Sequence, residues 1–196
     1  MSKKDKTIKR VFDFTLALIG LLITWPVILI AWFIASLETK SNGFFLQKRV
    51  GENGKLFTII KIKTMKDLPG STVTTATDRR ITKSGRFFRK YKIDELPQLI
   101  NILKGDMSFV GPRPDVPGYA DRLEGDDRVI LSVKPGITGP ATLKYKNEEE
   151  ILARVDNPKE YNDKVIWPDK VKINKEYIKN WSLKKDIEYI IKTIKG

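Results

Sequence analysis

Two adjacent carboxylates, Asp94 and Glu95, stand directly before apolar residues at helical spacing, and a glycine turn then leads to Arg113 between two prolines. Backbone amides at a helix N-terminus favour negative charge, so we expect Asp94 to be ionised and a phosphate to approach the same end. The prolines restrict the backbone around a guanidinium suited to bidentate phosphate binding. Taken alone, Asp94 could be a helix cap and Arg113 part of a structural turn. Together, residues 92–114 predict phosphate chemistry.

The absence of cysteine and histidine narrows the chemistry that the two carboxylates could do. Thiolate nucleophiles, disulfides and cysteine-ligated zinc are excluded, so a base, nucleophile or metal ligand must come mainly from Asp, Glu, Lys, Ser, Thr or Tyr. An ionised aspartate can attack phosphorus, neighbouring carboxylates can hold a hard cation such as Mg²⁺, and fixed cations can receive a departing phosphate. The residues around Asp94 supply all three groups.

The positive charges near the carboxylates come from two regions. Seven cations lead directly to the carboxylates, namely Arg79, Arg80, Lys83, Arg86, Arg89, Lys90 and Lys92. Further upstream, residues 44–51 and 55–65 flank a turn signal and predict a hairpin or two short strands. Alternation in the second strand places Lys61 and Lys63 on one side, for which a solvated face is the favoured interpretation. Polar residues 67–78 predict a surface loop that could act as a lid.

The first 38 residues predict a membrane segment. Five Lys or Arg residues occur in the first ten, no charge occurs over residues 14–37, and basic residues follow. The apolar run is too long for an ordinary secretory signal. A straight helix of this length measures about 36 Å and would cross a bilayer. Pro26 instead predicts a kink, and basic flanks place both ends on the cytoplasmic side, as in a re-entrant helix. Both topologies stay open. Asp13 at the boundary, next to Lys9 and Arg10, is expected to pair locally or to meet lipid headgroups, with a solvated charge as the simpler interpretation.

The formal net charge of +13 indicates a polyanionic partner, such as nucleic acid, anionic lipid or a phosphorylated substrate. A membrane-tethered protein that binds nucleic acid or anionic lipid without catalysis is therefore the alternative to an enzyme. It explains the charge but not the carboxylate pair, and the chain lacks the regular interleaving of aromatic and basic residues that stacks bases. Residues 105–114 and 133–140 predict irregular loops. Residues 183–194 carry an apolar helical face that should dock on the core or lie at a membrane interface.

These residues resemble the bacterial sugar transferase family, the monotopic phosphoglycosyl transferases. The resemblance rests on DELPQLINILKGDMSFVGPRP, on TDRRITKSGRFFRKYKI and KIKTM before it, and on KPGITGP after it. It extends from the basic N-terminus to the final YIKNWSLKKDIEYIIKTI. The resemblance implies transfer of a sugar phosphate from a UDP-sugar to undecaprenyl phosphate with release of UMP, the first membrane step of glycoconjugate biosynthesis. It also implies Mg²⁺ and a re-entrant membrane helix broken at Trp25-Pro26.

The resemblance assigns roles residue by residue. Asp94 would be the nucleophile that forms a covalent phosphosugar intermediate, and Glu95 would be the Mg²⁺ ligand beside it. Five further residues would complete the site: Lys61, Arg89 and Arg113 as contacts to phosphate groups, and Asp78 and Arg80 as pocket residues. A direct, single-step displacement on the same fold is the mechanistic alternative.

The chain departs from the family pattern in three places. Trp25-Pro26 stands where Ser-Pro is frequent, Lys92-Ile93 stands where Ser-Leu is common, and ATLKYKNEEE follows KPGITGP where many members carry another polar run. The first departure requires another partner for the carbonyl that the proline frees. The last concerns the choice of sugar or the subfamily.

The expected fold is α+β and mainly helical. Residues 1–38 would form the basic N-terminus and the re-entrant helix, and residues 39–196 a cytosolic catalytic domain with a short β-hairpin and interface-lying helices. The expected location is the cytoplasmic face of the bacterial inner membrane. The expected partners are a UDP-sugar, undecaprenyl phosphate and membrane lipids, without nucleic acid. The sugar, the pathway and a homodimer are left open.

Overall fold

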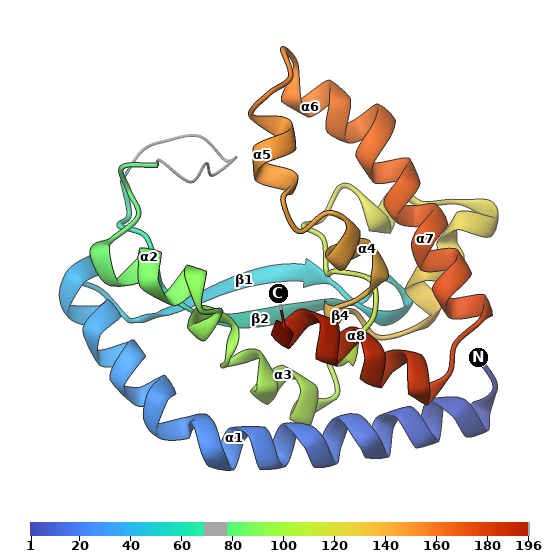
Figure 1. The fold of residues 1–196 in the computed structure, drawn as a ribbon, viewed down its shortest axis with the longest axis horizontal. Coiled ribbons are helices and arrows are strands. Elements are labelled where there is room, and N and C mark those ends of the chain that lie inside the picture. Colours follow the sequence, from blue (N-terminus) through green and yellow to red (C-terminus); the bar gives the residue numbers. More distant parts are fainter. Residues whose placement is uncertain (69–77, 196) are drawn as a thin grey trace.

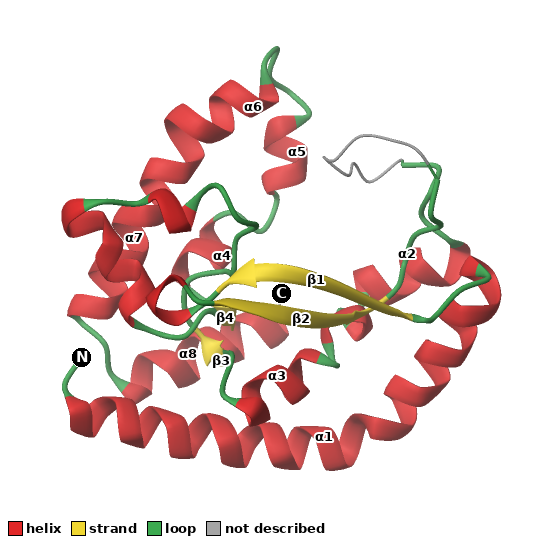
Figure 2. Cartoon of the chain, turned by 180° about the vertical axis from the view of Figure 1, so that it is seen from behind, coloured by secondary structure: helices red, strands yellow, loops and turns green. Residues whose placement is uncertain are grey.

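The computed structural model describes residues 1–68 and 78–195, so most of the predicted lid loop lies outside the described residues. As predicted, the fold is mainly helical with little strand (Figures 1 and 2). The helices and strands are α1 (Lys3–Thr39), β1 (Phe44–Val50), β2 (Leu56–Ile62), α2 (Lys83–Lys90), α3 (Gln98–Lys104), β3 (Ser108–Val110), β4 (Gly136–Thr138), α4 (Pro140–Lys144), α5 (Glu148–Leu152), α6 (Pro158–Tyr161), α7 (Trp167–Lys179) and α8 (Leu183–Lys195). A π-helical turn, Asn162–Ile166, joins α6 to α7.

Helix α1 presents small residues to the rest of the protein and large apolar residues outward. Ala17, Ala31 and Ala35 are buried, whereas Leu22 is 66% and Ile23 71% exposed. Small side chains let a helix backbone approach its neighbours closely, and an exposed apolar face of this extent is unfavourable in water. The helix is long and apolar enough to cross a membrane by length and composition. These features confirm the predicted apolar helix. Length and composition fit a spanning and a re-entrant helix alike.

Both halves of α1 pack on the same domain, and the helix bends between them (Figure 1). Pro26 lies within it, and a proline removes a hydrogen-bond donor and kinks a helix. The helix is nevertheless continuous, so the predicted break takes the form of a bend. Thr24 Oγ1 donates to the Gly20 carbonyl (2.7 Å), not to the Leu22 carbonyl that Pro26 frees. Such back-bonding by a threonine favours bending as well.

Polar residues at the N-terminal end of α1 are bonded within the protein. Arg10 donates to the carbonyl oxygens of Ile102 (2.5 Å) and Leu103 (2.8 Å). These carbonyls belong to the last turn of α3, where a cation is favourable. Asp13 is 2% exposed and accepts a hydrogen bond from the Phe109 amide (3.2 Å). The Lys9 Nζ atom lies 3.9 Å from Asp13 Oδ2, so the predicted local pairing is confirmed. The solvated interpretation is wrong, because the folded chain buries Asp13 and brings a distant backbone donor to it.

Strands β1 and β2 form the predicted antiparallel hairpin. Phe57 and Ile59 of β2 are buried in a cluster with residues of α1 and α3. The solvated interpretation of the two lysines is wrong, since the side chains of Lys61 and Lys63 are only 18% and 13% exposed. Lys63 pairs with Asp67, whereas Lys61 reaches towards the predicted carboxylates. Lys61 in β2 and Lys63 just after it therefore pair with carboxylates in two different parts of the protein.

A second, parallel pair of strands, β3 and β4, leads into the Arg113 loop. Both segments were predicted as irregular loops. Their glycines permit an unusually close approach: a Cβ on Gly111 would lie 2.5 Å from the Lys134 carbonyl oxygen, and one on Gly136 would lie 2.2 Å from the Gly111 nitrogen. Strands of three residues rich in glycine and flanked by proline have a weak sequence signal. Figure 2 shows β3 next to α8, against which it packs.

The face of α8 that packs on the core is not the predicted isoleucine face. Its isoleucines Ile187, Ile191 and Ile194 are 41%, 44% and 80% exposed, whereas Asp186 is wholly buried. Ile190 packs partly against the core cluster. Docking of the isoleucine face on the core is therefore wrong, because the hydrogen bonds of Asp186 orient the helix. The placement of that face at a membrane interface stays a prediction.

Candidate active site

The two predicted carboxylates lie in a tight turn that begins at Lys92. Lys92 has a left-handed backbone conformation (φ 57°), and a short 3-10 turn, Ile93–Glu95, follows before α3 begins. Asp94 is 8% exposed, and its buried Oδ1 accepts no hydrogen bond from the described residues. Pro97 is the N-cap residue of α3, and no side chain makes a capping hydrogen bond there. The helix-cap interpretation of Asp94 is therefore wrong. A buried carboxylate oxygen without a donor is costly, which makes it a candidate for ligand binding or chemistry.

Glu95 lies within reach of two of the predicted phosphate-binding cations. The Lys61 Nζ atom is 2.9 Å from Glu95 Oε1, and the Arg113 Nη2 atom is 3.4 Å from the same oxygen. The side chains of Lys61 and Glu95 are largely buried, whereas that of Arg113 is 51% exposed. A half-exposed guanidinium can contact an incoming phosphate without leaving the site. The fold thus brings together residues from β2, the turn before α3 and the loop after β3.

The environment separates the pKa values of the two carboxyls. Burial and the neighbouring Glu95 charge raise the pKa of Asp94 to about 6, against the opposing charge of Lys61. Burial also acts to raise the pKa of Glu95. The positive charges of Arg113 and Lys61 outweigh this effect and hold the pKa of Glu95 at about 2. Glu95 is therefore a permanent anion near neutral pH. Asp94 is mostly ionised at pH 7 and is a stronger base than an ordinary aspartate.

Arg89, from α2, is close enough for its charge to oppose the rise in the Asp94 pKa that burial causes. Its guanidinium forms no hydrogen bond or ion pair with the described residues. Asp78 and Arg80 are paired with each other, with the Arg80 Nη2 atom 2.6 Å from Asp78 Oδ2. The hydrogen bonds from Arg80 hold the pKa of Asp78 at about 2, and the charge of Arg89 acts in the same direction. The two predicted pocket residues thus form an ion pair near Arg89.

The carboxylates fit a hard divalent cation if a substrate supplies further ligands. Asp94 Oδ1 has no donor among the described residues, and Glu95 uses the single oxygen Oε1 for both of its cations. The described residues contain no group of three or more Asp, Glu, His or Cys side chains that could hold a metal ion. Mg²⁺ is commonly held by one or two carboxylates together with substrate phosphates and water. The residues present fit that mode of binding.

A third carboxyl, Asp115, was missed by the sequence reasoning. Burial raises the pKa of Asp115 to about 6, against the charges of Lys170, Arg49 and Arg113. Its carbonyl oxygen accepts a hydrogen bond from the Val50 amide (2.9 Å), which ties the loop to the end of β1. The available signal was an acidic residue directly after the PRP sequence. Two of its cationic neighbours, Lys170 and Arg49, are too distant in sequence to be predicted from spacing.

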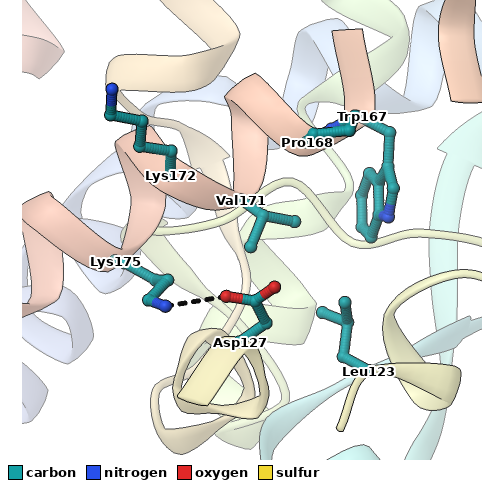
Figure 3. Close-up of a pocket in the computed structure, with 7 residues that line it drawn as sticks. All are labelled: Leu123, Asp127, Trp167, Pro168, Val171, Lys172 and Lys175. Atoms are coloured by element: carbon teal, nitrogen blue, oxygen red, sulfur yellow. Dashed lines mark hydrogen bonds and ion pairs between the residues drawn. The ribbon is translucent and has the colours of Figure 1, made fainter. Parts of the chain in front are cut away.

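A cavity of about 380 Å³ lies apart from these residues (Figure 3). It is lined by Leu123, Asp127, Trp167, Pro168, Val171, Lys172 and Lys175. Lys175 and Asp127 are paired across it, with 2.7 Å between Nζ and Oδ1. None of the predicted site residues lines this cavity. We therefore place the candidate active site at the two carboxylates.

A match to a known family extends over nearly the whole chain. Residues 4–196 match the family described as bacterial sugar transferase, so the match takes in α1, the carboxylates and α8. The chain belongs to the bacterial sugar transferase family. The resemblance inferred from the motifs is thereby confirmed. The roles of individual residues in this transferase stay predictions.

The similar proteins include one of nearly the same length as this chain and others that are much longer. The transferase is 37% identical over 189 residues to the uncharacterized sugar transferase EpsL of Bacillus subtilis (strain 168), covering 96% of this chain and 86% of that protein. It is 35% identical over 205 residues to the undecaprenyl-phosphate glucose phosphotransferase of Komagataeibacter xylinus, covering 100% and 36%. It is 33% identical over 202 residues to the UDP-glucose:undecaprenyl-phosphate glucose-1-phosphate transferase of Escherichia coli (strain K12), covering 99% and 41%. The chain therefore matches nearly all of EpsL and less than half of the two longer proteins.

Proposed function

We propose that this transferase moves a sugar phosphate from a UDP-sugar to undecaprenyl phosphate through a covalent intermediate on Asp94. The main support is the buried Asp94 Oδ1, which has no donor among the described residues, next to Glu95 with its two cations. The names of the K. xylinus and E. coli relatives indicate undecaprenyl phosphate as the acceptor of those proteins, and the second name also indicates a UDP-glucose donor. A carboxylate with a raised pKa that is still ionised at pH 7 is well suited to act as the nucleophile.

The proposed reaction has two displacements at one phosphorus atom. An oxygen of the ionised Asp94 carboxylate attacks the phosphorus that bears the sugar. The bond from this phosphorus to the bridging oxygen breaks, UMP leaves with the electron pair, and the sugar phosphate remains on Asp94 as an acyl phosphate. A phosphate oxygen of undecaprenyl phosphate then attacks the same phosphorus. The carboxylate leaves unchanged, and the product is undecaprenyl-diphospho-sugar.

The surrounding cations would hold the phosphates for this attack. Lys61 is a buried cation fixed on β2, Arg113 is half-exposed on a proline-braced loop, and Arg89 is unpaired among the described residues. Such fixed charges stabilise the negative charge that builds up on a leaving phosphate. Held by Glu95 and the diphosphate, Mg²⁺ would neutralise part of the same charge.

The contacts of α1 support a re-entrant topology. Near its N-terminal end Arg10 bonds to α3, and near its C-terminal end Glu38 accepts a hydrogen bond from the Ser84 amide (3.2 Å) at the start of α2. A straight spanning helix would carry these two ends to opposite sides of a bilayer. Because both ends bond to one domain and both flanks are basic, we infer that α1 enters and leaves the membrane on the cytoplasmic face. The carboxylates then lie near the level of a lipid phosphate.

A donor screen tests the activity. The full-length protein in lipid nanodiscs is given undecaprenyl phosphate, Mg²⁺ and one UDP-sugar at a time, and UMP is measured. We expect at least one donor to give UMP in an acceptor-dependent manner. Absence of UMP with every donor, together with salt-sensitive binding of nucleic acid, would support the non-catalytic binder instead.

A trapping experiment tests the covalent step. Incubation with a donor radiolabelled in the sugar, without acceptor, should label the wild-type protein and should not label Asp94→Asn. Asp127→Asn is the matched control, because Asp127 lies in a half-exposed surface ion pair away from the site, and it should be labelled like the wild type. UMP production without any labelled wild-type protein would favour direct displacement.

A further inference from the structure

Asp186 of α8 is the centre of a buried polar cluster. Its Oδ2 accepts hydrogen bonds from Lys9 Nζ (2.6 Å) and Trp181 Nε1 (3.0 Å), and its Oδ1 accepts one from the Tyr177 hydroxyl (2.7 Å). We call Lys9, Tyr177, Trp181 and Asp186 the Asp186 hub. The hub joins α1, near the N-terminus of the chain, to the two consecutive C-terminal helices α7 and α8. A buried ion pair with further hydrogen bonds has little freedom to rearrange, because each unpaired group would be costly.

The hub also bonds to the strand that leads to Arg113. The Tyr177 hydroxyl lies 3.2 Å from the Val110 carbonyl oxygen. Asp13, whose carboxylate is 3.9 Å from Lys9 Nζ, accepts a hydrogen bond from the amide of Phe109. Phe109 and Val110 are consecutive residues of β3. Two polar groups of this strand are therefore held by side chains of α1 and α7.

Little freedom remains between β3 and Arg113. The Gly111 amide donates to the Thr138 carbonyl (2.9 Å), and the Gly136 amide donates to the Pro112 carbonyl (2.8 Å). The proline directly before Arg113 restricts the backbone further. A displacement of β3 would therefore move Arg113 relative to Glu95, to which it is paired at 3.4 Å.

We propose that Tyr177 and Asp186 are positioning residues that hold Arg113 at the carboxylates and join it, through Lys9, to helix α1. The inference rests on the proposed function in that Arg113 is taken to contact a phosphate. Tyr177 and Asp186 act through Arg113 and do not touch substrate. The membrane helix and the phosphate-binding loop then move as one unit.

A double-mutant cycle tests the coupling in the full-length protein in nanodiscs. Tyr177→Phe removes one hydroxyl and should lower kcat/KM for UMP release about tenfold, since small misplacements of a binding group are costly. Arg113→Ala should lower it about 100-fold. The double variant should be no slower than Arg113→Ala within about twofold, because Tyr177 acts through Arg113. Losses that multiply would overturn the proposal.

Tyr189→Phe is the matched control. The Tyr189 ring packs edge-on against the Tyr177 ring (6.0 Å between centroids), and its hydroxyl forms no hydrogen bond with the described residues. It should retain wild-type kcat/KM and thermal stability. An equal loss of activity in both Phe variants would overturn the proposal, because the loss would then not depend on the hydrogen bonds of the Tyr177 hydroxyl.

Hydrogen exchange tests the inference independently of any activity. Mass spectrometry of peptides covering residues 108–114 should show roughly tenfold faster amide exchange in Tyr177→Phe and unchanged exchange in Tyr189→Phe. If the wild type releases no UMP from any donor, the proposed function fails, but this measurement still decides whether the hub holds the loop. Unchanged exchange in Tyr177→Phe would overturn the positioning role.

Discussion

Asp94 and Asp186 are both buried aspartates, but their surroundings are opposite. Asp186 is 0% exposed and accepts three hydrogen bonds from side chains, one of them from a lysine. Asp94 is 8% exposed, and its Oδ1 accepts none from the described residues. A buried acceptor that is fully satisfied contributes to a unique structure, whereas one without a donor reduces stability. The contrast separates a carboxylate that organises the fold from one that is kept free for a ligand.

The local backbone explains part of the difference. Asp186 lies in the first turn of α8, where side chains of α1 and α7 converge on it. Asp94 lies in a short turn behind the left-handed Lys92, and the charges around it act at a distance. Perturbed pKa values without saturated hydrogen bonding are typical of functional sites.

Replacing Asp94 should give the largest effect on the reaction. Asp94→Asn should lower the rate of UMP release by at least about 10³-fold, because the nucleophile is lost. The pKa of about 6 in the folded protein lies above the unfolded value, so folding stability falls as the pH rises from about 4 to 6. Asp94→Asn should therefore raise the unfolding free energy at pH 7 on the order of 2 kcal/mol, with no gain below about pH 4. Urea unfolding at pH 7 and at about pH 4 measures this difference in unfolding free energy. A variant less stable than the wild type at pH 7 would show that Asp94, like Asp186, stabilises the fold.

The two lysines of the β2 region give the next largest effect. Lys61→Met should lower kcat/KM for UMP release about 100-fold, since it removes a buried cation 2.9 Å from Glu95. Lys63→Met is the matched control, because Lys63 pairs with Asp67 instead, and its rate should change less than about twofold. Steady-state kinetics with a fixed donor measure both. Equal losses would show that the strand as a whole matters and not the contact with Glu95.

The pH dependence should be smaller but diagnostic. The proposed mechanism requires the ionised form of Asp94, so kcat/KM should fall about tenfold between pH 7 and pH 5 with a midpoint near pH 6. The charge of Lys61 lowers the Asp94 pKa, so the midpoint in Lys61→Met should move to higher pH. The dependence of kcat/KM on pH, recorded for both proteins in one buffer series of constant ionic strength, gives both midpoints. A flat profile over this range would assign the nucleophile to another group.

The link from the hub to α1 should give the smallest change in rate. Lys9→Met should lower UMP release only about threefold, but it leaves the buried Asp186 charge without its cation and should lower the unfolding free energy by about 3 kcal/mol. In the Lys9→Met/Asp186→Asn double variant the two losses should not add, since neither charge remains. Denaturant unfolding in detergent micelles gives these values. Additive losses would show that the two residues are not coupled.

The candidate site could be predicted from the sequence largely because its main parts are contiguous. Asp94, Glu95 and Arg113 lie within one run of residues, and Lys61 lies in a strand marked by alternation and a preceding turn. The apolar helix was predictable for the same reason, since a long uncharged run is a local signal.

Features that depend on distant partners were not predictable in this way. The local pairing of Asp13 with Lys9 was predictable, but its burial was not, because the Phe109 amide that it binds is contributed by a remote strand. The burial of Asp186 was not predicted, because the isoleucines of α8 suggested that another face of this helix is buried. Strands β3 and β4 form through close glycine contacts, for which periodicity gives no evidence.

The alanine face of α1 has a consequence for how the protein is made. Ala17 shares a core cluster with Ile59, Leu99 and Ile102, so the membrane helix forms one wall of the interior of the catalytic domain. A chain that began after Thr39 would leave this wall open to water. If α1 enters the membrane as proposed, folding of the domain and insertion of the helix have to occur together, because the two share one core.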